Sequence, residues 1–73
     1  MVFASFHYPK GFIQIAQEIG FPPFGEGGEF DGWEAAFERA REIVEERNHP
    51  VEVTGTGNMC KVFYPVGMGY PDK

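Results

Sequence analysis

Cysteine is almost absent from this chain, and its scarcity excludes two common ways of stabilising a small protein. Cys60 is the only cysteine among the 73 residues, so no internal disulfide can form and no zinc site with several cysteine ligands is possible. Long apolar runs are missing too, and residues 1–7 lack the basic and apolar regions of a secretory signal. The sequence therefore predicts a soluble protein of the reducing cytoplasm.

Motifs for catalysis, metal binding and nucleotide binding are lacking as well. The glycines at 25–28 do not form a phosphate loop, because acidic residues surround them where a phosphate needs a cation. His7, His49 and Cys60 are the only obvious bases, nucleophiles or soft ligands. If the strands that carry His7 and Cys60 are neighbours, a thiol–imidazole pair results. We predict no catalytic residue, metal or cofactor, and keep a thiol-dependent redox role for Cys60 as a minor alternative.

Basic residues are also few, and the excess of acids is local. Six Lys and Arg stand against eleven Asp and Glu, which gives a net charge of −5. Nine of the acids lie between residues 26 and 52, and the rest of the chain is nearly neutral. Such a field repels nucleic acid and anionic membranes and favours a basic protein partner.

Aromatic side chains are abundant: eight Phe, three Tyr and one Trp. A chain of this length buries only about 60% of its unfolded surface, so large rings must supply much of the core. This composition favours a folded domain over a disordered acidic tail. We predict one compact domain over residues 1–66, followed by an extended tail over 67–73. This tail is expected to be ordered only if Met68 or Tyr70 packs into a groove.

The central acidic segment has the period of a helix, from about Gly32 to Arg47. One sector is apolar and holds Trp33, Ala36, Phe37, Ala40, Ile43, Val44 and the stem of Arg47. The opposite sector is acidic and holds Glu34, Glu38, Glu42, Glu45 and Glu46. Asp31 and Glu34 have the spacing of a capping box, whereas Asn48 and Pro50 end the helix.

The glutamates of this helix stand mostly four residues apart, and each such pair costs roughly 0.2–0.5 kcal/mol in an isolated helix. We expect two arginines to offset part of this repulsion. Arg39 is spaced to reach Glu42, and Arg41 is spaced to reach Glu38 and Glu45. A solvated helix face and a docking surface both explain the pattern.

Strands are predicted at both ends of the chain. Residues 51–54 and 59–64 alternate apolar and polar side chains around a glycine turn at 55–58, which is typical of a β-hairpin. Residues 2–8 are expected to form a strand with Val2, Ala4, Phe6 and Tyr8 on one face.

The segment between this first strand and the long helix is less clear. Residues 12–19 are a helix that Gly20 and Phe21 stop, which we favour, or a second strand. Residues 20–30 are expected to be a loop, and its rings either close the core or face a partner; they are Phe21, Phe24 and Phe30.

Together these elements predict a small α+β fold. An antiparallel sheet of three or four strands carries the one long amphipathic helix across one face. The order is β-α-α-β-β, or β-β-α-β-β if residues 12–17 are extended.

The pattern from Phe30 to Pro65, with its order F-D-x-W-E-A-A, then P-V-E-V, a glycine turn and K-V-F-Y-P, resembles a helix-plus-hairpin module. It is similar to that of many small phage and mobile-element accessory proteins, including several type I anti-CRISPR inhibitors. The likeness covers about half of the chain and consists of apolar and turn positions. It implies a protein without an active site that occupies a basic, often nucleic-acid-binding, surface of a larger host complex.

The sequence thus predicts a non-enzymatic, protein-binding module that binds neither nucleic acid nor membrane directly. Its acidic helix face pairs with a basic partner at the rim of the interface, while Phe24 or Trp33 anchors it. The alternative is a small structural module that forms homodimers through the edge strand and its Met68–Tyr70 tail.

Overall fold

The computed structural model describes residues 1–67, except for the side chain of Asn58. Its elements in chain order are β1 (Val2–His7), α1 (Lys10–Glu18), β2 (Glu26–Phe30), α2 (Trp33–Arg47), β3 (Val51–Gly55), a short 3-10 helix (Thr56–Asn58) and β4 (Cys60–Phe63). The predicted α+β class is confirmed, with a four-stranded antiparallel sheet and a long helix. The predicted tail lies outside the described residues, apart from Gly67.

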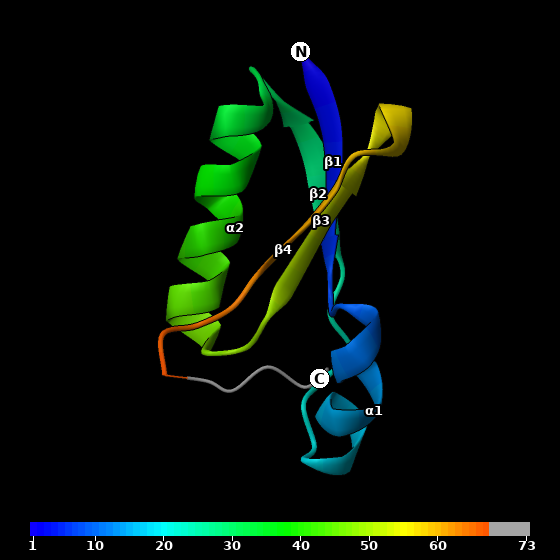
Figure 1. Cartoon of the computed structure of the whole chain (residues 1–73), viewed down its shortest axis with the longest axis vertical. Helices are drawn as coiled ribbons and strands as arrows, with labels where there is room; N and C mark the ends of the chain where they lie inside the picture. The colour runs from blue at the N-terminus through cyan, green and yellow to red at the C-terminus, as the bar shows by residue number, and fades with distance from the viewer. Residues whose placement is uncertain (68–73) are drawn as a thin grey trace.

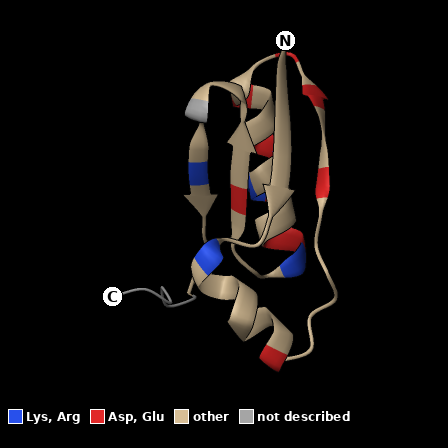
Figure 2. Ribbon diagram, turned by 90° about the vertical axis from the view of Figure 1, so that its right-hand side faces the viewer, with Lys and Arg blue, Asp and Glu red and all other residues tan. Residues whose placement is uncertain are grey.

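The four strands have the order β2-β1-β3-β4, and all neighbours are antiparallel. Helix α2 lies along one face of this sheet, and α1 lies beyond the end of the strands (Figure 1). No helix of the described chain covers the opposite face, which Figure 2 shows towards the viewer. No helix of residues 1–67 is long and apolar enough to cross a membrane.

The core lies between α2 and the sheet. Alanines at 36 and 40 are fully buried and let the helix approach closely, while Ile43 fills the space over the central strands. The sheet contributes alternate residues of β1 and β3, namely Ala4, Phe6, Val51 and Val53. Each large apolar side chain buried here stabilises the fold by about 1.5–3 kcal/mol. The apolar sector predicted for the helix is therefore confirmed.

The two ends of α2 differ in how well the sequence predicts them. Helix α2 begins at Trp33, and Gly32 occupies the N-cap position without any side-chain cap. The predicted capping box of Asp31 and Glu34 is wrong because Asp31 lies one residue before the cap. At the other end Asn48 adopts the left-handed conformation with φ 57°, and its N–H donates to the Val44 carbonyl at 2.9 Å. The predicted C-terminal signal is confirmed.

Helix α1 confirms the favoured reading of residues 12–19. Its end is the paired hydrogen-bond motif that a C′ glycine makes possible: Phe21 N–H donates to the Ala16 carbonyl at 2.8 Å, and Gly20, at φ +86°, donates to the Gln17 carbonyl at 3.2 Å. However, only part of the apolar stripe of α1 is buried. Phe12 is buried whereas Ile19 stays 58% exposed.

Strand β2 corrects the predicted loop over residues 20–30. Glu-Gly-Gly-Glu-Phe contains a single residue that favours strands, yet it pairs with β1 from Val2↔Phe30 to Phe6↔Glu26. Gly27 permits this pairing at close range, because a Cβ there would lie 3.0 Å from the Ala4 carbonyl oxygen. The order of elements is β-α-β-α-β-β, which differs from both predicted orders.

Candidate partner-binding surfaces

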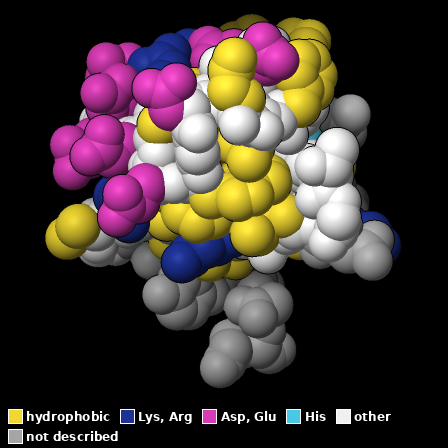
Figure 3. Space-filling view, turned by 90° about the horizontal axis from the view of Figure 1, so that it is seen from above, with side chains coloured by type: hydrophobic (Ala, Val, Ile, Leu, Met, Phe, Trp, Pro, Cys, Tyr) yellow, Lys and Arg dark blue, Asp and Glu magenta, His cyan; other side chains and the backbone are white. Residues whose placement is uncertain are grey.

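The acidic face is the outer side of α2. Its five side chains are all exposed, because the opposite side of the helix is committed to the core. They are Glu34, Glu38, Glu42, Glu45 and Glu46. Figure 3 shows acidic side chains gathered on the α2 side of the molecule, next to a hydrophobic patch.

The arginines of α2 mostly turn away from the acidic face. Arg39 donates to Glu42 at 3.2 Å, as predicted, but its other nitrogen donates to Glu26 on β2 at 3.3 Å. Arg47 donates to Glu26 at 2.6 Å. Arg41 lies over the ring of Phe63, with its Cζ 5.4 Å from the ring centroid.

The predicted pairs of Arg41 with Glu38 and Glu45 are therefore wrong. The ring of Phe63 lies beside Arg41 in space although it is distant in sequence, and it offers a cation–π contact. Among residues 1–67, four glutamates of the acidic face make no ion pair: Glu34, Glu38, Glu45 and Glu46. Their charge is unneutralised, and it faces solvent.

Glu26 joins two of these arginines to the sheet edge, and sequence reasoning did not find it. The hydrogen bond from Arg47 lowers the pKa of the Glu26 carboxyl, and both guanidinium charges add to this effect against the opposing effect of burial. Only the position of β2 reveals the contact, because 13 and 21 residues separate Glu26 from Arg39 and Arg47.

The two predicted anchors are occupied within the protein itself. Trp33 is half-buried, packs directly over Gly55 and stacks on Phe37 with ring centroids 5.9 Å apart. Phe24 is half-buried in a second cluster of rings, where Arg47 Cζ lies 5.3 Å from its centroid. Anchoring of a partner by either ring stays a prediction.

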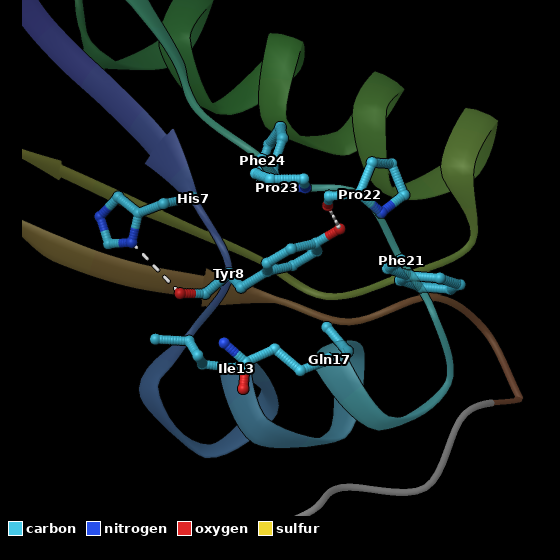
Figure 4. Close-up of a pocket in the computed structure, with 9 residues that line it drawn as sticks. His7, Tyr8, Ile13, Gln17, Phe21, Pro22, Pro23 and Phe24 are labelled. Carbon is cyan, nitrogen blue, oxygen red and sulfur yellow. Dashed lines mark hydrogen bonds between the residues drawn. The ribbon is translucent and has the colours of Figure 1, made fainter.

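The second ring cluster forms where α1, the segment 19–25 and the end of α2 meet. Its members are Tyr8, Phe12, Phe21, Phe24 and His49. The Tyr8 hydroxyl donates to the Pro22 carbonyl at 2.8 Å and holds the segment against β1 (Figure 4). Burial raises the pKa of Tyr8, so this hydroxyl keeps its proton.

Two hollows flank this cluster. One, of about 480 Å³, lies between Tyr8 and the side chains of Ile13 and Gln17 from α1 (Figure 4). The other, of about 320 Å³, is lined by Arg47 and His49. Both share one wall, which consists of Tyr8, Phe21, Pro22, Pro23 and Phe24. Volumes of about 300–1,000 Å³ are those of ordinary ligand pockets.

His7 and Cys60 are not neighbours, because β3 lies between their strands. The Cys60 thiol instead donates to Glu52 on β3 at 2.7 Å. His7 Nδ1 donates to the Tyr8 carbonyl, and the Thr54 hydroxyl donates to His7 Nε2, each at 3.2 Å. The hydrogen bond to Glu52, together with burial, raises the pKa of the Cys60 thiol. Within residues 1–67 no group of three His, Cys, Asp or Glu side chains is placed to hold a metal.

Comparison with known proteins adds no relative to this picture. No family model, no curated protein and no solved structure matches the chain. Its function is therefore inferred from its own surfaces.

Proposed function

We propose that this protein is a non-enzymatic binding module that sets the acidic face of α2 against a basic surface of a larger complex. The observation that supports it is the placement of the arginines. Three are available on α2, yet only Arg39 contacts a glutamate of the acidic face. Cations from a partner would neutralise charges that have no ion pair within residues 1–67.

Electrostatics favours this arrangement in two ways. Glutamates four residues apart repel each other along the helix, so a partner's Lys or Arg side chains relieve a cost that the free protein bears. A concentrated negative field also speeds the encounter with a positive surface. Basic surfaces of that kind commonly hold nucleic acid. We therefore propose competition with nucleic acid in the cytoplasm, as the resemblance to phage inhibitors implies.

Affinity capture with charge-reversed variants tests this proposal. Glu38→Lys with Glu45→Lys reverses two glutamates that make no ion pair within the described chain, and so leaves the network of Arg39 and Glu26 intact. Glu18→Lys with Glu29→Lys is the matched control, because it changes net charge equally on α1 and β2. Wild type and control should capture the same protein from a host lysate at low salt, and added DNA or RNA should release it.

The acidic-face variant should capture little of that protein. Equal capture by both double variants would remove the acidic face from the interface. Capture that neither salt nor nucleic acid disrupts would contradict a basic, nucleic-acid-binding target.

A homodimer is the second candidate, and the open face of the sheet favours it. Phe3 lies on this face near the start of β1, beside Glu29 of β2, and is 58% exposed. Self-association would give so small a chain a larger core. Sedimentation should then show a dimer that Phe3→Ser dissociates, whereas a monomer at high micromolar concentration would exclude it.

A further inference from the structure

His49 is a buried side chain with an unused hydrogen-bonding atom. It follows the C-cap of α2 and is only 4% exposed. Rings surround it: the centroids of Tyr8, Phe24 and Phe21 lie 4.9, 5.2 and 5.6 Å from that of His49. Its Nδ1 lies 3.0 Å from the Pro50 carbonyl oxygen. Because a carbonyl oxygen only accepts, Nδ1 carries the proton, and Nε2 of the neutral ring is an acceptor.

No described residue donates to Nε2 of His49. Within the described chain, every side-chain nitrogen and oxygen that is completely buried has a partner. Nε2 has none, so it is not completely sealed and retains a small opening. His49 lines the hollow of about 320 Å³. An acceptor on a residue that lines an apolar hollow calls for a donor on whatever fills it.

The walls of the hollow define the rest of the ligand. Tyr8, Phe21 and Phe24 present aromatic surface, and two prolines complete it. Arg47 lies over Phe24 and disfavours a cation. An anion would have to compete with Glu26, which already holds Arg47 at 2.6 Å. An uncharged aromatic group is the chemistry that fits these surroundings.

We propose that this hollow binds a single uncharged aromatic ring that carries one donor, a phenol or an indole, and that the donor bonds to His49 Nε2. This chemistry has two sources, a free small molecule and a Tyr or Trp side chain of a protein partner. The site is separate from the acidic face, so each can fail without the other.

The test is a titration of the full chain with p-cresol and with toluene, which has the same ring but no donor. An unsatisfied buried acceptor makes p-cresol bind at least about fivefold more tightly than toluene. The ¹⁵N resonance of His49 Nε2 should move upfield with p-cresol only. Equal affinities, no binding at millimolar concentration, or an Nε2 resonance that stays still would overturn the proposal.

Three variants locate the site. His49→Phe keeps a ring in place but removes the acceptor, so the preference for p-cresol should disappear. Phe24→Leu removes part of the wall and should weaken p-cresol and toluene alike, which keeps the test valid if His49→Phe does not fold. Ile13→Ala alters only the other hollow, so both affinities should be unchanged. Loss of p-cresol binding in Ile13→Ala would place the ring in the hollow of about 480 Å³ and contradict the proposal.

The source is decided by a second probe, the blocked tripeptide acetyl-Gly-Tyr-Gly-amide. Binding of this peptide at least as tightly as p-cresol supports a tyrosine side chain of a partner. Binding of p-cresol alone supports a free small molecule. With either source, the probe that binds should move the ¹⁵N resonance of His49 Nε2 upfield. A resonance that moves with neither probe contradicts the proposal.

Discussion

Arg47 lies 2.6 Å from Glu26, and this ion pair joins the last turn of α2 to the edge strand β2. Arg39, which precedes Arg47 in α2, contacts the other oxygen of the same carboxylate at 3.3 Å. One glutamate of β2 therefore holds two arginines of α2, of which only Arg39 also contacts a glutamate of the acidic face. The pairing stabilises the sheet edge and leaves the outer side of α2 negative.

Glu26→Gln should lower the free energy of unfolding at pH 7 by about 0.5–1 kcal/mol, because the side chains are about one-third exposed and solvent screens them. The folded-state pKa of Glu26 lies below its ordinary value of 4.5. Its contribution is thus complete above about pH 4.5 and is lost as pH falls through the folded-state pKa. Urea unfolding at pH 7 and at pH 3 measures this.

The difference between wild type and Glu26→Gln should narrow at pH 3. Glu29→Gln is the control, since this exposed neighbour has no ion pair within the described chain, and it should change little. A Glu26→Gln effect of the same size at both pH values would contradict the ion-pair account.

Gly55→Ala should destabilise the protein by about 1–3 kcal/mol through overpacking. An added Cβ would overlap the ring of Trp33 and lie 2.6 Å from the carbonyl oxygen of Phe3, which is backbone and cannot easily move. Gly25→Ala is the control, because nothing lies within 4 Å of a Cβ there. Urea unfolding followed by the fluorescence of Trp33 checks both. Equal stability of the two variants would show that Trp33 does not pack on β3.

The long helix and its C-terminal end could be predicted because the signals are local. The spacing of Ala36, Ala40 and Ile43 fixes one face, and Gly20 before Phe21 marks the end of α1 without tertiary information. Strand β2 could not be predicted, because its residues have little intrinsic preference for a strand. They form one because they pair with β1. The predicted ion pairs of Arg41 were wrong for a related reason. Sequence spacing identifies neighbours on the same helix, but it does not identify Phe63 on β4 as the contact of Arg41.

The same limit applies to the candidate sites. The acidic face was predictable from the periodicity, whereas the directions of the α2 arginines depend on partners across the fold, Glu26 on β2 and Phe63 on β4. The hollow beside His49 combines Tyr8, which follows β1, with the segment 19–25 and the end of α2, and no sequence motif connects them.

Cys60 should react slowly with thiol reagents although it is exposed. Its raised pKa, caused first by the hydrogen bond to Glu52, reduces the thiolate fraction at a given pH. Glu52→Gln removes the nearby charge, lowers the pKa of the thiol and should increase the rate severalfold at pH 8. The rate of disulfide exchange with a chromogenic reagent measures this. Glu29→Gln, on the same face of the sheet, should have no effect; a rate unaffected by Glu52→Gln would contradict the contact.

The central claim, that the acidic face of α2 is the partner surface, is tested most directly by the salt dependence of binding to the captured partner. The dissociation constant is measured between about 50 and 500 mM salt for wild type and for both double variants. The account predicts a steep dependence for wild type and for Glu18→Lys with Glu29→Lys, and weak, nearly salt-independent binding for Glu38→Lys with Glu45→Lys. The same affinity and the same salt dependence for all three proteins would contradict it.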